Sequence, residues 1–204
     1  MLDGTNIVDM LSDSADTALG YALNLSDDMS TIESVLLNIF VPAVGMLISM
    51  WAVYDFMRLR NPRSGSNVTL QSVGLRLLIG PATFQLVALV RSLSVSFLGQ
   101  RGANVEKDMA ASYMSEATSA MDPTSAGILL GLGFLVLVGW IAALRAMIAF
   151  ARIGTPGQDG FELFRTGVAR LIVGTILASF QFFMDDIFAS ATGESGQFSS
   201  GLNT

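Results

Sequence analysis

The chain has 204 residues, of which 51% are apolar and 14% are charged, and its formal net charge is −6. Globular proteins usually carry about a quarter charged residues, so this composition excludes an ordinary soluble domain and favours a membrane protein. Histidine and cysteine are absent, which removes the commonest general base, the commonest zinc ligands and any disulfide. The acidic balance argues against nucleic-acid binding, which needs a basic surface, so we expect no sequence-specific nucleic-acid contact.

The first 34 residues form an acidic segment. Up to Glu33 it has seven acidic residues and no Lys or Arg. It lacks the basic and apolar stretches of a signal peptide, so we expect internal apolar segments to drive insertion. Apolar residues near helical spacing from Asp9 to Leu25 predict a short amphipathic helix at the membrane interface. The capping-box pattern Ser30-Thr31-Ile32-Glu33 predicts that a helix begins there.

Four later segments approach the roughly 20 apolar residues that a helical span needs. Pro42 and Pro81 are expected to kink the first two spans, and Asp122-Pro123 has the capping residue and first-turn proline typical of a helix start. The second and fourth segments contain charged residues, so each could instead be a helix shielded by protein. The four segments run from about Val35 to Met57, Leu75 to Leu98, Ala126 to Ala151 and Gly167 to Phe188.

The sequence therefore predicts an all-α, multi-pass membrane bundle of about four transmembrane helices, arranged as two tandem helical hairpins at 35–98 and 126–188. Between the hairpins, residues 99–125 place Val105, Met109, Tyr113 and Met114 near helical spacing, which predicts a helix in this loop. The Gly- and Ser-rich residues 189–204 are typical of a flexible tail.

Basic residues give the orientation. Arg58, Arg60 and Arg63 follow the first span, and Arg152 and Arg165 follow the third. The positive-inside rule places both of these turns in the cytoplasm. Both termini and the central loop then face the periplasm of a bacterial inner membrane.

A shift of 94 positions aligns the first hairpin with the second without a gap. Apolar helices match one another often by chance, but here two arginines and two glycines coincide at corresponding depths. We therefore favour a duplicated hairpin, whose parallel repeats are less typical of secondary transporters than inverted ones. The matched pairs are Phe40 and Phe134, Val44 and Val138, Gly45 and Gly139, Ala52 and Ala146, Phe56 and Phe150, Arg58 and Arg152, Arg76 and Arg170, Leu77 and Leu171, and Gly80 and Gly174.

Charged residues inside the spans need a partner, water or a route to the surface. One group of arginines is placed to snorkel to lipid headgroups or to bind their phosphates, and bound phospholipid is the one non-protein component that the sequence suggests. These residues are Arg58, Arg60, Arg63, Arg76, Arg152 and Arg170.

Two ion pairs are predicted from depth in the membrane. The repeat aligns Arg91 with Asp185 near the outer face, and Asp55 and Arg145 share a depth towards the cytoplasm. Each pair would lie within one chain or between subunits, and snorkelling is the alternative for each charge alone.

Small and polar residues inside the spans have two interpretations each. Gly127 and Gly131 form a small-xxx-small pattern, and with Gly45 and Gly139 they predict close helix packing; the alternative is that the third span is simply central. Hydroxyl and amide side chains near mid-membrane would either bond between helices or line a lumen. They are Ser49, Thr83, Gln85, Thr175, Ser179 and Gln181.

Catalysis is not expected. Without histidine there is no Ser–His pair, and the predicted topology puts Asp55 and Asp185 at opposite ends of the membrane, where they cannot share a proton. The stretch from Gly154 to Gly160 lacks the lysine of a phosphate-binding loop and predicts a tight turn. We predict no catalytic, cofactor-binding or metal-ligating residues.

In span size, outside termini and the Arg-Asn-Pro-Arg turn at Arg60 to Arg63, the chain resembles the small inner-membrane proteins of type IVB secretion and related conjugative transfer systems. This resemblance implies a non-enzymatic, self-associating membrane component that is pilin-like or pore-forming. Its partners would be membrane lipid, further copies and other secretion or conjugation subunits, and it could end in an extracellular filament. The alternative is a small transporter or channel acting alone.

Overall fold

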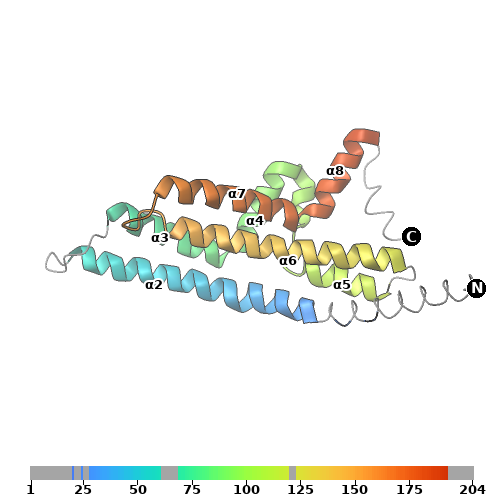
Figure 1. Cartoon of the computed structure of the whole chain (residues 1–204), viewed down its shortest axis with the longest axis horizontal. Helices are drawn as coiled ribbons and strands as arrows, with labels where there is room; N and C mark the ends of the chain where they lie inside the picture. The colour runs from blue at the N-terminus through green and yellow to red at the C-terminus, as the bar shows by residue number, and fades with distance from the viewer. Residues whose placement is uncertain (1–19, 21–23, 25–27, 61–68, 120–122, 193–204) are drawn as a thin grey trace, which may run out of the picture.

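The computed structural model describes residues 20, 24, 28–60, 69–119 and 123–192. Among these residues the fold is all-α with seven α-helices, which confirms the predicted fold class (Figure 1). Helices 28–59 and 125–151 are each long and apolar enough to cross a membrane, so the described residues contain two candidate spans, or up to four if each of two bent helix pairs counts as one span.

The elements follow one another as two hairpins joined by a short helical linker. They are the π-helix η1 (Leu36–Phe40), α2 (Val41–Arg60), α3 (Leu70–Phe84), α4 (Leu86–Leu98), the 3-10 helix η3 (Gly99–Asn104), α5 (Met109–Ser119), α6 (Pro123–Ala151), α7 (Gly160–Ala178) and α8 (Phe180–Thr192).

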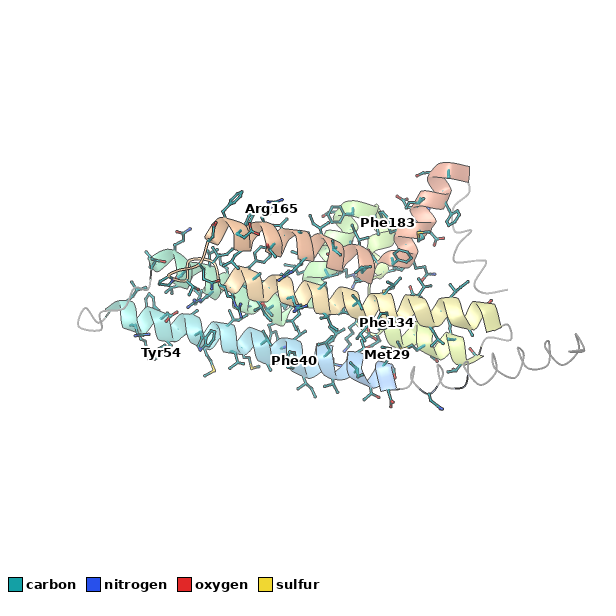
Figure 2. The ribbon with its side chains drawn as sticks, viewed as in Figure 1. Met29, Phe40, Tyr54, Phe134, Arg165 and Phe183 are labelled. Atoms are coloured by element: carbon teal, nitrogen blue, oxygen red, sulfur yellow. The ribbon has the colours of Figure 1, made fainter. Side chains whose placement is uncertain are left out.

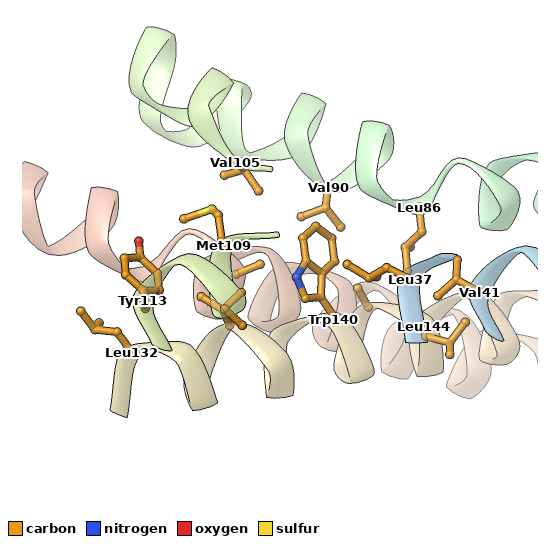
Figure 3. Packing of buried hydrophobic residues seen from close by; sticks show 14 of the residues in the cluster. Leu37, Val41, Leu86, Val90, Val105, Met109, Tyr113, Leu132, Trp140 and Leu144 are labelled. Atoms are coloured by element: carbon orange, nitrogen blue, oxygen red, sulfur yellow. The ribbon is translucent and has the colours of Figure 1, made fainter. Parts of the chain in front are cut away.

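The hairpins pack side by side. α2 packs on α3, α3 packs on α6, and α6 packs on α7 and on α5. In Figure 1, α6 lies between α2 and α7, which are the outer helices of the bundle. Buried apolar side chains join the hairpins: in Figure 3, Leu37 and Val41 of the first long helix approach Leu86, Trp140 and Leu144.

The first long helix remains continuous past Pro42. The π-helix η1 lies directly before α2. Proline has no amide to donate to the carbonyl four residues earlier, and its ring collides with that carbonyl. A π-turn widens the helix locally, which accommodates the ring without a sharp kink.

The second and fourth spans are not continuous helices, contrary to the sequence prediction. α3 and α4 meet at 87° around Gln85, and α7 and α8 meet at 78° around Ser179. Pro81 lies one turn before the first break. At the second break there is no proline; the Ser179 hydroxyl donates to the Thr175 carbonyl at 2.7 Å, a back-bond that often bends helices.

The breaks fall at matched positions of the repeat, since Gln85 and Ser179 are 94 residues apart. The packing matches too. A Cβ built on Gly45 would lie 2.7 Å from the Phe84 amide nitrogen and 2.9 Å from the Gly80 carbonyl oxygen. For Gly139 the corresponding atoms are the Ala178 nitrogen at 2.6 Å and the Gly174 oxygen at 2.8 Å. The two hairpins therefore share one packing geometry, which is what a duplication predicts.

The segments outside the spans differ in how well they were predicted. The central segment contains α5, as the spacing of its apolar residues predicts, and α6 begins at Pro123. α8 continues to Thr192, so the start of the expected tail is helical. The predicted helix from Asp9 to Leu25 falls almost entirely outside the described residues, as do Asp122 and residues 193–204.

Candidate functional site

The strongest polar cluster lies where α2, α3 and α6 meet, near the turns of the two hairpins. The Arg76 guanidinium of α3 pairs with the Asp55 carboxylate of α2. It also donates from Nε to the Ala151 carbonyl at 3.0 Å and from Nη2 to the Thr155 hydroxyl at 2.9 Å. Both charged side chains are largely buried, at 14% and 11% exposure. We call this cluster the Arg76 junction.

The Arg76 junction corrects one sequence prediction. Within the chain, Asp55 pairs with Arg76 and not with Arg145, which is exposed on α6. Arg76 bonds to three protein acceptors and also lines the groove described below; its contact with lipid headgroups stays a prediction. Asp55 lies near the end of α2 and Arg76 near the start of α3, so the antiparallel packing of these neighbouring helices brings the two side chains together.

A second polar site is built around Glu33, at the other end of the first long helix. Glu33 is 1% exposed. Oε1 accepts from the Ala110 amide and from the Trp140 indole Nε1, both at 3.2 Å, and Oε2 accepts from the Ala111 amide at 2.8 Å. Because Ala110 and Ala111 lie in the first turn of α5, the carboxylate caps that helix and faces its positive end.

The capping-box prediction for Ser30 and Glu33 is therefore wrong. The helix already includes residues 28–30, so Ser30 does not begin it. Tertiary partners, which a local pattern does not reveal, bind the Glu33 carboxylate instead.

We expect Glu33→Ala to lower the free energy of unfolding by about 1–3 kcal/mol, because it leaves buried amide and indole donors without an acceptor. Glu33→Gln should be nearly as harmful, since its NH₂ group would meet donors. Thermal unfolding in detergent, followed by tryptophan fluorescence, measures both.

The control is Glu106→Gln, an exposed carboxylate on the segment that leads into α5. Equal, small effects of the Glu33 and Glu106 variants would contradict the capping role.

Tyr113 ties α5 to α8, because its hydroxyl donates to the Gln181 side-chain oxygen. Burial raises the pKa of this phenol, and the carboxylates of Glu116 and Asp185 raise the pKa further. The phenol therefore remains protonated and a donor at neutral pH.

Three arginines line one open pocket on the outer side of the second hairpin. Arg145 of α6, Arg152 of the turn that follows and Arg170 of α7 share this pocket, of about 460 Å³, with Glu162 and Thr166. Three cationic groups thus share the pocket with a single carboxylate, so its net charge favours an anion or the negative end of a helix. We call it the arginine pocket.

A mostly apolar groove of about 460 Å³ separates the two hairpins near their turns. Val44, Leu47, Ile48 and Trp51 of α2 line one side. Ile148 and Ala151 of α6, and Arg152 and Gln158 of the segment that follows it, are among the residues that line the rest. Polar groups thus lie at the end of the groove near the turns. The turn itself contains Gly154 and Gly157 at φ of +80° and +81°, a backbone conformation natural to glycine.

The other predicted arginine sites are placed as follows. Arg58 is exposed and lies over the Tyr54 ring, 5.5 Å from its centroid. The Arg60 side chain and Arg63 fall outside the described residues. Arg91 is exposed on α4 and Asp185 is buried on α8; their pairing stays a prediction. A neighbouring contact, Arg101 to Asp186 at 3.5 Å, links η3 to α8.

The predicted packing glycines divide into two classes. Gly45 and Gly139 lie at close backbone approaches between the two helices of each hairpin. Gly127 and Gly131 would have no atom within 4 Å of an added Cβ, so they make no close helix contact within the described chain.

Several hydroxyl groups inside the hairpins bond to carbonyls of their own helices, whereas the buried Ser94 hydroxyl of α4 has no partner among the described residues. Thr83 donates to the Ile79 carbonyl at 2.7 Å and Thr175 donates to the Leu171 carbonyl at 2.8 Å. Ser49 bonds the Gly45 carbonyl at 2.9 Å. Because these groups need no water, they support the packing interpretation over a water-filled lumen.

Comparisons with protein-family models, with curated proteins and with solved structures found no match to this chain.

Proposed function

We propose that this chain is a non-enzymatic, self-associating subunit of a membrane assembly. The proposal rests on the exposed apolar face of the first long helix, which no other described part of the chain covers. Only 28% of an apolar 18-residue stretch of this helix is buried, compared with 50% for the corresponding stretch of the helix that contains α6. In Figure 2, Phe40 and Tyr54 lie on the outer side of α2, and each is 54% exposed. A contiguous exposed apolar face of this kind is typical of a surface that contacts protein or lipid, and we assign it to a protein partner within the membrane.

The assembly we propose is a type IV secretion or conjugation apparatus of the IVB kind. The support is the resemblance in span size, layout and the Arg60–Arg63 turn. In such a setting the chain would lie in the bacterial inner membrane with both termini in the periplasm, or in a filament after assembly. Its partners would be further copies and other subunits of the apparatus.

Bound phospholipid fits this proposal. The groove between the hairpins offers an apolar wall from Val44 to Trp51 for an acyl chain, and Arg152 and Gln158 near the turns for a phosphate. Basic pockets between helices on the cytoplasmic side bind anionic headgroups, which agrees with the predicted orientation.

A stand-alone transporter or channel would instead need polar groups that are free to meet a substrate or ion. The hydroxyls of Thr83, Thr175 and Ser179 are engaged by their own helices, which weighs against that function.

The test is the mass of the detergent-extracted protein, by light scattering and electron imaging with lipid retained. We expect particles of several copies that carry phospholipid, and no ion flux when the protein is placed in vesicles. A monomer that conducts ions would overturn the proposal in favour of a channel.

A further inference from the structure

The repeat provides, within one chain, a junction between successive hairpins. On the α3 side, Arg76 donates to the Ala151 carbonyl at 3.0 Å. Ser72 lies against the turn after α6, where a Cβ on Gly154 would be 2.9 Å from the Ser72 Cβ. The last turn of a helix presents carbonyls without partners and the negative end of its dipole. Arg76 therefore satisfies the C-terminal end of α6.

Shifting this junction by 94 residues identifies two faces that remain open. On α2, Met50, Tyr54 and Met57 correspond to Leu144, Ile148 and Ala151 of α6. Met50 and Met57 are 67% and 58% exposed. Their counterparts Leu144 and Ala151 are 4% and 9% exposed. The same stripe is thus largely buried on α6, where Arg76 of α3 bonds to the Ala151 carbonyl, and left uncovered on α2.

The complementary face lies on α7. Thr166, Arg170 and Val173 correspond to Ser72, Arg76 and Ile79 of α3. Ser72 is buried and Thr166 is only half-buried; Arg170 is exposed, whereas the side chain of Arg76 is largely buried. Val173 is 51% exposed. Because α2 and α7 are the outer helices (Figure 1), one chain presents both halves of the junction on opposite sides.

The arginine pocket lies where this junction would form. Its residues Arg170 and Thr166 are the counterparts of Arg76 and Ser72, which in the first hairpin contact the end of α6 and the turn that follows. The Asp55 carboxylate that pairs with Arg76 has no counterpart, because the matched residue is Ala149. Arg170 therefore lacks the acid that its repeat partner has within its own hairpin.

We propose that the α7 face of one copy packs on the α2 face of a second copy, as α3 packs on α6. This proposal rests on the proposed self-association and specifies its geometry. Arg170 reaches the carbonyls in the last turn of α2 of the second copy, near Met57, and the end of that helix fills the arginine pocket. The contact joins different faces, so it repeats head to tail and closes into a ring or continues as a filament.

The test uses cysteine cross-linking, which is clean because the chain has no cysteine. Met57→Cys with Thr166→Cys in one chain should give a ladder of dimers, trimers and larger products with a short thiol-reactive cross-linker in membranes. Each single variant should stop at dimer or below. A control pair, Met57→Cys with Phe134→Cys, places the second thiol on an exposed position of α6 and should give no ladder.

Arg170→Gln in the Met57/Thr166 pair should reduce the ladder about tenfold, as expected for the loss of one charge-assisted hydrogen bond. Arg165→Gln, another exposed arginine on α7 (Figure 2), should leave the ladder unchanged.

The outcomes separate this geometry from self-association itself. Multi-copy particles without a Met57/Thr166 ladder would overturn the head-to-tail contact and leave self-association standing. Monomers in the mass measurement would overturn both. If Arg170→Gln removed bound phosphatidylglycerol, measured by native mass spectrometry, while the ladder was unchanged, the pocket would hold a lipid phosphate and the proposed role of Arg170 would be wrong.

Discussion

Asp55→Ala is expected to lower the free energy of unfolding by about 3–5 kcal/mol, because it leaves a buried guanidinium without its counter-charge. Arg76 is only 14% exposed and lies between three helices. Its remaining acceptors, a carbonyl and a hydroxyl, cannot neutralise it. Unfolding by titration with sodium dodecyl sulfate, followed by tryptophan fluorescence, gives the free energy.

Two controls separate this charge effect from a general loss of packing. Asp186→Ala removes an acid whose pair with Arg101 is 38% and 54% exposed, and exposed pairs contribute about 0–1 kcal/mol. Combining Asp55→Ala with Arg76→Met should be less harmful than Asp55→Ala alone, since no unpaired charge remains. Equal losses from Asp55→Ala and Asp186→Ala would contradict the role of the Arg76 junction.

Gly139→Ala is expected to destabilise the chain, and Gly131→Ala, two turns earlier on the same helix, to stabilise it. The Cβ on Gly139 would lie 2.6 Å from the Ala178 backbone nitrogen and 2.8 Å from the Gly174 oxygen. The helices must separate, and overpacking of this kind costs about 1–3 kcal/mol. Gly131 has free space around it, so alanine there should contribute up to about 1 kcal/mol through helix propensity.

The same detergent-unfolding experiment measures both glycine variants, and Gly45→Ala should behave like Gly139→Ala because its contacts match. A Gly139→Ala protein as stable as the Gly131→Ala protein would show that α6 and α7 are not in contact at this point.

The sequence predicted those parts of the fold that depend on pattern. Blocks of apolar residues identified the hairpins. The shift of 94 residues predicted that Gly45 corresponds to Gly139 and Gly80 to Gly174. In the structure, those four glycines lie at two close helix approaches. A repeat is informative because each copy constrains the other, whereas Gly127 and Gly131 matched a motif alone and have no close neighbour within the described residues.

The parts that escaped prediction depend on contacts between distant segments. Glu33 fits a local capping box, yet its three donors come from residues 77 to 107 positions away. The sequence next to the bend at Ser179 contains no proline or glycine that would predict a bend. The predicted pair of Asp55 and Arg145 relied on their similar depth in the membrane, which does not identify the neighbouring helix. The observed partner, Arg76, lies 21 positions from Asp55 in the same hairpin.

The Arg76 junction has a consequence for the order of biosynthesis. Its ion pair joins residues 21 positions apart and needs only the first hairpin. Its other two bonds reach 75 and 79 positions further along the chain, to Ala151 and Thr155. Because chains fold from the N-terminus as they are made, Arg76 is neutralised early and fully bonded only after the second hairpin has inserted. Before Ala151 and Thr155 have been synthesised, Asp55 is therefore the partner that neutralises the Arg76 guanidinium.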